Sequence, residues 1–377
     1  MKVLHILYRL MPSGAEKMLA DSAEMFRSAN VEGEILVNDS EEGVLAPTLK
    51  KCGYPVHVIP YNAAGLHLLK FWRICRAERY DAVHIHVIRG FASLAWAARL
   101  AGVKHIVKTF HGMFTPRNKL QKTVQGLRRR LAGLAGTRFV AISRSVQENE
   151  MRTFGCNAKL VWNFADETGF PIADVSVGER MRKTLGIPDD AFVLLSVGNC
   201  HSDSHYKIKN HSLVINALAK LPDMIRRSVV YVHVGAEKEG FPERKLANEL
   251  GVAANTRFLG PRNDIYDLLC AANVYVMSSL HEGLGISTIE AAFAGREMIL
   301  TNVQGLKDFG GVIRNGITYC ELTPESMAKA IQEKMESMHL AAVPNLSRNL
   351  SIREDALKTF SMKVGVAELV KLYSGRV

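Results

Sequence analysis

Short apolar runs alternate with longer amphipathic stretches along nearly the whole chain of 377 residues. The apolar runs are rich in Val, Ile and Leu and are bounded by Gly, Asn, Asp or Pro, which is the pattern of buried strands. The stretches between them repeat apolar residues every three or four positions, as amphipathic helices do. Strands that alternate with helices form βαβ units with parallel sheets. The pattern therefore predicts an α/β fold.

The predicted elements form two sets. In the first set the expected strands are Lys2–Tyr8, Gly33–Val37, Pro55–Ile59, Ala82–Val87, His105–Thr109 and Arg138–Ile142, and the expected helices include Glu16–Ala29, Leu66–Glu78, Phe91–Leu100 and Lys119–Ala135. After Trp162 the pattern is irregular as far as Asp190. A second set of strands follows at Phe192–Val197, Ser228–Val234, Thr256–Leu259, Asn273–Met277 and Met298–Thr301. Two doubly wound sheets joined near residue 165 are the simplest architecture, with a ligand expected where strands end, in a cleft between the two domains.

Composition indicates a globular protein of the cytoplasm. Hydrophobic residues make up 47% of the chain and charged residues 23%, which is ordinary for a folded domain. No run of 18 apolar residues occurs, because Arg99 interrupts the stretch from Phe91 to Val103, so a membrane-spanning helix is not expected. The six cysteines are scattered without a CxxC pair, which is typical of reduced thiols rather than of disulfides or a zinc site.

Positive charge is concentrated in the first half of the chain. The net charge is +12 over residues 1–165 and −1 over the remainder. Basic residues cluster on two predicted helices, at Lys70, Arg73 and Arg76 and at Lys122, Arg128, Arg129 and Arg130. Two interpretations stay open, namely solvated helix edges and docking on an anionic membrane surface. Nucleic acid is not expected as a partner, because no recognition module is readable.

The clearest chemical signal follows the predicted strand Asn273–Met277. A loop with Gly283, Leu284 and Gly285 leads into a predicted helix that begins near Ile286. Glycines allow a ligand to approach the backbone closely, and a helix N-terminus favours an anion such as a diphosphate. Within that helix Glu290 stands among apolar residues, where a carboxylate needs hydrogen-bond donors such as ribose hydroxyls. The alternative is that Glu290 and Glu282 are ordinary surface charges.

A second signal follows the predicted strand Phe192–Val197. Lys209 stands at the entry to a predicted helix, where a lone cation opposes the helix dipole unless an anion lies nearby. A diphosphate would supply that anion, although a solvated lysine is an equal alternative. The residues His201, Asp203 and His205 invite a metal hypothesis, but they lie in a predicted loop and no second ligand cluster is evident. We therefore expect no metal site.

These motifs resemble glycosyltransferase family 4, which contains retaining enzymes with the two-Rossmann GT-B fold. The resemblance rests on the Glu-x7-Glu spacing of Glu282 and Glu290 and on motifs in the family's order along nearly the whole chain. These further motifs are Pro12–Lys17, Asp81–His86, Thr109–Gly112, Val140–Ser143, Val161–Asn163, Arg257–Gly260 and Thr359–Ser361. The resemblance implies two Rossmann-like domains facing each other across a cleft. Residues 1–164 would bind the acceptor and residues 165–361 the donor, and a C-terminal helix (362–377) would cross back to the N-terminal domain.

The resemblance also implies roles for individual residues. Glu290 would hold the ribose, while Glu282 and the backbone of Gly283, Leu284 and Gly285 would contact the sugar and phosphates. Lys209 would stabilise the departing diphosphate. From the N-terminal domain, His111 would contact the donor sugar, and the loop with Ser13 and Gly14 would approach the diphosphate. His84 and His86 alternate on a strand and are expected to pack in the core or at the cleft rim.

One position departs from the family's pattern. Asn199 stands where the family usually has an arginine, and the spacing from there to Lys209 is ten residues instead of about five. An asparagine lacks the charged fork of an arginine. Lys207 or a basic residue of the N-terminal domain could compensate for the missing charge.

The sequence thus predicts a retaining glycosyltransferase of the cytoplasm, at the inner face of the plasma membrane. The donor would be a nucleotide diphosphate sugar, with UDP the commonest carrier in the family, and no cofactor is expected. The acceptor would be a glycan or a lipid-linked sugar in the synthesis of cell-surface polysaccharide. Two alternatives remain, a sugar-nucleotide epimerase or phosphorylase of the same fold and a non-enzymatic basic binding protein. A nicotinamide dehydrogenase is excluded, because no GxGxxG follows the first strand.

Overall fold

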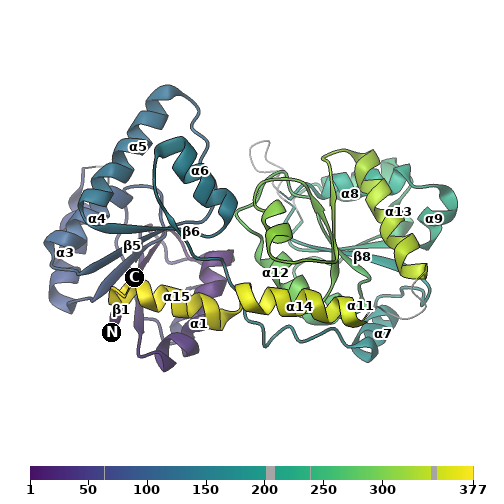
Figure 1. The fold of residues 1–377 in the computed structure, drawn as a ribbon, viewed down its shortest axis with the longest axis horizontal. Helices are drawn as coiled ribbons and strands as arrows, with labels where there is room; N and C mark the ends of the chain where they lie inside the picture. Colours follow the sequence, from purple (N-terminus) through teal and green to yellow (C-terminus); the bar gives the residue numbers. More distant parts are fainter. Residues whose placement is uncertain (63, 201–208, 238, 341–345, 377) are drawn as a thin grey trace. The chain divides into compact units, whose positions relative to one another are not determined.

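The computed structural model describes residues 1–62, 64–200, 209–237, 239–340 and 346–376 (Figure 1). The chain divides into two compact units, which are described separately below. The N-terminal unit comprises Met1–Asp166 and Phe360–Val377, and the C-terminal unit comprises Glu167–Thr359. Each unit is built on a parallel sheet flanked by helices, which confirms the predicted α/β class and the two-sheet architecture.

The N-terminal unit contains a seven-stranded parallel sheet in the order β3-β2-β1-β4-β5-β6-β7. Its strands are β1 (Lys2–Leu7), β2 (Glu32–Val37), β3 (Val56–Val58), β4 (Ala82–Ile85), β5 (His105–Phe110), β6 (Thr137–Ala141) and β7 (Lys159–Leu160). Its helices are α1 (Gly14–Ser28), α2 (Ala46–Lys51), α3 (Leu66–Glu78), α4 (Phe91–Leu100), α5 (Lys119–Leu134) and α6 (Arg144–Phe154), together with the C-terminal helix α15 (Met362–Ser374).

Both faces of this sheet are buried, as expected for parallel strands between helical layers. Successive side chains of β1 point to opposite faces, so Val3 and Leu7 join one core cluster while Leu4 and Ile6 join another. The first cluster is covered by α1 and α15, and the second by α3 and α4.

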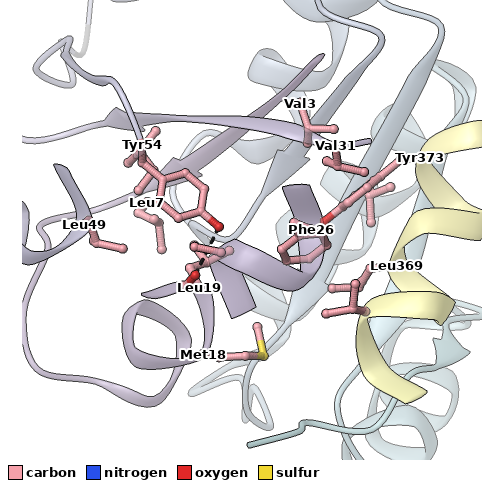
Figure 2. Packing of buried hydrophobic residues seen from close by; sticks show 14 of the residues in the cluster. Val3, Leu7, Met18, Leu19, Phe26, Val31, Leu49, Tyr54, Leu369 and Tyr373 are labelled. Carbon is pink, nitrogen blue, oxygen red and sulfur yellow. Dashed lines mark hydrogen bonds between the residues drawn. The ribbon is translucent and has the colours of Figure 1, made fainter. Parts of the chain in front are cut away.

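The last helix of the chain, α15, packs on the N-terminal unit, as predicted. Figure 2 shows Leu369 and Tyr373 of α15 beside Phe26 of α1, and the rings of Phe26 and Tyr373 lie 6.3 Å apart. A glycine is required at position 365, because a Cβ there would come within 1.8 Å of the Phe164 ring. The close approach of α15 to Phe164 therefore fixes where the chain re-enters the N-terminal unit.

The C-terminal unit contains a six-stranded parallel sheet in the order β10-β9-β8-β11-β12-β13. Its strands are β8 (Phe192–Val197), β9 (Val229–Val234), β10 (Thr256–Phe258), β11 (Val274–Met277), β12 (Glu297–Thr301) and β13 (Ile317–Cys320). Its helices are α7 (Val175–Thr184), α8 (His211–Lys220), α9 (Asp223–Ser228), α10 (Pro242–Glu249), α11 (Ile265–Ala271), α12 (Ile286–Phe293), α13 (Pro324–Leu340) and α14 (Leu346–Phe360). Within the described residues, no helix has the length and apolar character needed to cross a bilayer.

Candidate active site

Two loops meet at the carboxyl ends of the neighbouring strands β8 and β11 in the C-terminal unit. Lys209, just before α8, places its Nζ 2.7 Å from Oε1 of Glu282. The Ser279 hydroxyl donates to the same carboxylate oxygen over 2.8 Å, and the Ser278 hydroxyl donates to the carbonyl of Lys209 over 2.9 Å. The structure thus brings together Lys209 and Glu282, which are 73 positions apart in the chain.

The surroundings of Lys209 direct its ammonium group towards this meeting point. A Cβ at Gly198 would lie 3.3 Å from three carbons of the lysine stem, so the glycine at the end of β8 leaves room for the stem. The side chains of Lys209 and Glu282 are 24% and 11% exposed, and water therefore weakens their attraction less than on an open surface. An ammonium group has three N–H donors, so it can hold Glu282 and an anion together.

The N-terminus of α12 lies at the same strand ends. Gly285 precedes the helix with a φ of +90°, a conformation that favours glycine, and Leu284 beside it is buried. The Ser287 hydroxyl, in the first turn, accepts a hydrogen bond from Tyr275 of β11 and donates one to the Val197 carbonyl of β8. Since the first N–H groups of a helix lack intrahelical partners, this tip is suited to an anion.

Glu290 lies on α12, and its side chain is 5% exposed. The sequence interpretation that made it an exposed surface charge is therefore wrong for Glu290. Sequence reasoning assigned no role to Ser278, Ser279, Ser287 or Tyr275, which join these loops. A signal was present for the first two, because a pair of serines directly after a buried strand marks polar groups at a strand end.

Asn199 ties the loop after β8 to the loop after β9. Its Oδ1 accepts a hydrogen bond from the backbone N–H of Ala236 over 2.9 Å. Asn199 and Lys209 also line a pocket of about 440 Å³ that extends along α10 from Pro242 to Glu249. His201, Asp203, His205 and Lys207 lie outside the described residues.

In the N-terminal unit, His111 follows β5 and belongs to a chain of histidines. Its Nε2 lies 2.8 Å from Nδ1 of His86, whose Nε2 lies 3.4 Å from Nδ1 of His5. His84 instead joins Tyr373 of α15 and Thr109 of β5, at 2.6 and 2.7 Å. Burial and then the charge of Lys108 lower the pKa of His111 to about 3, so its imidazole is neutral near pH 7.

The loop before α1 carries the other two predicted residues of this unit. Ser13 is the N-cap of α1, and its hydroxyl donates a hydrogen bond to the carboxylate of Glu16. The spacing of a serine and a glutamate three residues later is that of a capping box, but here the two side chains bond to each other instead of to the backbone. Gly14 is the first residue of α1. The predicted site residues thus form two groups, one in each unit.

The buried histidines make the N-terminal unit sensitive to acid. Burial lowers the pKa of His5 to about 3, so between pH 6.5 and 3 the unfolded chain binds a proton that the folded chain does not. The contribution of His5 to the free energy of unfolding is therefore complete above pH 6.5 and is lost as the pH falls towards 3. Between pH 7 and 5 the loss from His5 amounts to about 2 kcal/mol, and we expect His5→Phe to remove that part of the pH dependence.

Denaturation followed by tryptophan fluorescence measures this effect, because all three tryptophans, Trp72, Trp96 and Trp162, lie in the N-terminal unit. The free energy of unfolding of the wild type should fall more steeply with acidification than that of the variant. An identical dependence on pH in the two proteins would contradict the assignment of His5 as a buried neutral imidazole.

Proteins similar to this chain are glycosyltransferases. Residues 12–167 match Glycosyltransferase Family 4, and residues 177–349 match Glycosyl transferases group 1. The chain is 25% identical over 320 residues to the UDP-Gal:alpha-D-GlcNAc-diphosphoundecaprenol alpha-1,3-galactosyltransferase of Escherichia coli, covering 81% of this chain and 80% of the relative. It is 20% identical to the capsular polysaccharide biosynthesis glycosyltransferase CapH of Staphylococcus aureus, over 100% of this chain and 99% of the relative.

Solved structures show the same fold. The structure of Anabaena HepE in complex with UDP superposes with a TM-score of 0.82 at 19% identity, covering 100% of both chains. Another structure of that protein, in complex with UDP-glucose, superposes with a TM-score of 0.77 at 20% identity, covering 98% of this chain and 99% of that one. The two family matches together span most of the chain, which therefore belongs to glycosyltransferase family 4 and is a nucleotide-sugar-dependent glycosyltransferase with the GT-B fold.

Proposed function

We propose that this glycosyltransferase takes its sugar from a UDP-sugar and transfers it, with retention of configuration, to a glycan or lipid-linked acceptor in cell-surface polysaccharide synthesis. The observation that carries the donor assignment is the meeting of Lys209, Glu282 and the N-terminus of α12 at adjacent strand ends. A cation and a helix tip converging on one point form a site for a diphosphate.

The donor occupies this site in a defined direction. The diphosphate lies against the N–H groups at Gly285 and Ile286 and accepts hydrogen bonds from Lys209. The ribose hydroxyls donate to Glu290, whose burial makes the loss of such donors costly. Glu282 and the loop from Gly283 to Gly285 then face the sugar.

Transfer breaks the bond between the anomeric carbon and the diphosphate oxygen, so positive charge grows on the sugar and negative charge on the leaving group. Lys209 and the amides at the tip of α12 stabilise the leaving group electrostatically. The departing diphosphate oxygen takes the proton of the acceptor hydroxyl, which attacks from the same face and preserves the configuration. Asn199 adds no charge here, because its side chain is a neutral amide, and its Oδ1 accepts a hydrogen bond from Ala236.

Some of the similar proteins carry a nucleotide in their names or structures, and that nucleotide is UDP. This favours UDP over other carriers for the present chain. The Escherichia coli relative is named for UDP-Gal, and the Anabaena structures contain UDP and UDP-glucose. An epimerase or a phosphorylase would use the same nucleotide pocket or fold but would act without a separate acceptor or would require phosphate.

A thermal-shift panel with UDP, GDP and ADP tests the donor class. We expect a concentration-dependent rise of the melting temperature with UDP that exceeds the rise with GDP or ADP, because a ligand stabilises the state that binds it. Equal shifts with all three, or none with UDP, would contradict the assignment. Incubation with UDP-sugars in the absence of acceptor separates a transferase from an epimerase, which would convert the sugar under these conditions.

The acceptor side of the proposal is a lipid surface contacted by α5. Five apolar residues form an exposed stripe along this helix, namely Leu120, Val124, Leu127, Leu131 and Leu134, with 37 to 75% of each residue exposed. At about 100° per residue they share one side, opposite the buried Gln125, Arg129 and Ala132. Lys119 and Arg130 flank the stripe on one side and Arg128 on the other.

One residue of the predicted basic surface does not belong to it. Arg129 is 4% exposed and donates to both oxygens of Glu150, at 2.5 and 2.8 Å. The sequence interpretation of Arg129 as a surface charge is therefore wrong, because this position falls on the side of α5 that faces the unit. Lys119, Arg128, Arg130 and the apolar stripe suit an anionic bilayer, which attracts the charges and buries the leucines.

Vesicle co-sedimentation measures this docking. We expect stronger binding to phosphatidylglycerol vesicles than to phosphatidylcholine vesicles. Leu127→Ser should lower the partition coefficient about tenfold, since burying a leucine contributes about 1.5 kcal/mol or more. The matched control is Leu350→Ser on α14, where the leucine is 43% exposed. Equal binding to both lipids, or an equal effect of the two substitutions, would count against docking through α5.

A further inference from the structure

A buried cluster of one thiol and two imidazoles lies behind the candidate donor site. Cys200 follows β8, His211 is the first residue of α8, and His233 lies on β9. The three residues are 4, 3 and 0% exposed, and one potential ligand atom from each lies within 4.8 Å of the other two. No step of the proposed transfer uses these side chains.

The spacing within the cluster is close to that of a tetrahedral zinc site. Zinc binds thiolate sulfur at about 2.3 Å and imidazole nitrogen at about 2.0 Å, so ligand atoms around it are about 3.3 to 3.6 Å apart. Cys200 Sγ and His233 Nε2 are separated by 3.4 Å. The rings of His211 and His233 have centroids 4.3 Å apart and planes inclined by 71°.

The groups around the cluster resemble the outer shell of a metal site. His233 Nε2, which faces Cys200 Sγ, also lies 2.9 Å from the Gly198 carbonyl, a contact that an ion bound at Nε2 would replace. His211 Nδ1 lies 3.2 Å from the Tyr231 hydroxyl. Metal-binding histidines commonly use one ring nitrogen in this way, which orients the other nitrogen. The remaining ring nitrogen of His233, Nδ1, is buried and has no hydrogen-bond partner within the part of the chain that the structure describes.

A carboxylate stands next to the thiol. Burial and then the charges of Glu243 and Glu237 raise the pKa of the Cys200 thiol to about 12, and Glu243 lines the same pocket as Cys200 and His211. Glu243 lies in the first turn of α10. It supplies an oxygen ligand for the fourth position that a set of one cysteine and two histidines leaves open.

We propose that Cys200, His211 and His233 bind a zinc ion, with Glu243 completing its coordination. A thiolate with imidazoles is the donor set that zinc prefers, and binding displaces the thiol proton. This inference departs from the sequence-based expectation of no metal site. The ion is structural, because the cluster is buried and the diphosphate is held by other groups.

A second histidine cluster, formed by His5, His84 and His86 in the N-terminal unit, is a weaker candidate. Both ring nitrogens of His84 are engaged by Tyr373 and Thr109. The buried ammonium group of Lys108 also lies close by and donates to the His86 carbonyl. A nearby cation opposes a divalent ion, and the hydrogen bonds already satisfy the ring.

The ion would hold the two ends of the segment that carries Lys209. Cys200 begins this segment and His211 ends it, two residues after Lys209, while His233 anchors both to β9. Zinc would therefore fix the backbone from which Lys209 reaches Glu282. Binding of the ion itself is independent of donor chemistry, so it can be tested without any assay of transfer.

Metal titration of the full chain tests the proposal. The protein is freed of metal with a chelator and titrated with Zn²⁺ against a competing indicator, and with Co²⁺ followed by absorption. We expect one zinc per chain, the visible bands of tetrahedral cobalt and a near-ultraviolet thiolate-to-cobalt charge-transfer band. Cys200→Ser should abolish the charge-transfer band. His233→Asn should weaken zinc binding at least about tenfold, as even changes to partners of metal ligands do.

The matched control is Cys320→Ser, which alters another buried thiol of the same unit, whose sulfur lies 3.9 Å from the Met327 sulfur. This variant should bind both metals as the wild type does. X-ray absorption of the wild-type zinc complex requires no variant and should show one sulfur and two imidazole ligands. Absence of saturable zinc binding, a charge-transfer band that survives Cys200→Ser, or a spectrum without sulfur would overturn the proposal.

Discussion

Lys209→Ala is expected to slow sugar transfer by about 100- to 1,000-fold, the usual effect of deleting one preorganised donor to a developing negative charge. The loss should appear mainly in kcat, because the charge on the leaving diphosphate grows as the glycosidic bond breaks. Steady-state kinetics with the UDP-sugar and its acceptor measure it.

Lys220→Ala is the matched control, since Lys220 ends α8 in the same unit and its side chain is 57% exposed. This variant should transfer sugar at the wild-type rate. Because Lys209→Ala also deprives Glu282 of its partner, melting curves of both variants are needed to separate catalysis from stability. A folded Lys209→Ala protein with wild-type kcat would show that Lys209 has no part in the reaction.

Glu290→Gln is expected to weaken the binding of UDP by about 10- to 100-fold. Hydrogen bonds to a charged group contribute about 1.5 to 3 kcal/mol, and glutamine retains the shape of glutamate without its charge. Calorimetry with UDP and UMP measures the change. Both nucleotides contain the ribose, so the variant should lose the same factor for each.

The comparison of UDP with UMP distinguishes the role of Glu290 from the role of Lys209. Lys209→Ala should weaken the binding of UDP more than the binding of UMP, because the lysine contacts the diphosphate. Glu179→Ala, an exposed position on α7, provides a control that should leave both affinities unchanged. If Glu290→Gln weakened the binding of UDP but not the binding of UMP, the assignment of Glu290 to the ribose would be wrong.

The strands were predictable where β-branched and apolar residues form a continuous buried run. β8, for example, was predicted with its observed bounds. The pattern missed β7 and β13, because β7 has two half-buried residues and β13 is buried only at Cys320. It also extended β4 to Val87, although the strand ends at Ile85. Runs of apolar residues indicate burial, and burial continues beyond the last hydrogen bond of a strand.

The site was predictable in its parts but not in its assembly. Glycines after a strand and a glutamate in an apolar helix can be recognised locally, so Gly285 and Glu290 stood out. The contact between Lys209 and Glu282 depends on β8 and β11 being neighbours, although two strands separate them in the chain. Strand order is a property of the whole sheet and is not encoded in local spacing.

Two features, the apolar stripe of α5 and the buried cysteine–histidine cluster, could not be recognised in the sequence, for related reasons. The leucines of α5 repeat with helical spacing, which ordinarily marks a buried face, whereas here they are exposed and Arg129 is buried. Cys200, His211 and His233 are 11 and 22 residues apart, so they lack the short spacing by which zinc sites are recognised. In both cases the decisive information is which face of an element meets the core.

A crystal structure of the protein with UDP is the most direct test of the donor site. We expect the diphosphate at the N-terminus of α12 within hydrogen-bonding distance of Lys209 Nζ, and the ribose hydroxyls on the carboxylate of Glu290. A nucleotide bound elsewhere, or held with its ribose away from Glu290 and its phosphates away from Lys209, would contradict this assignment.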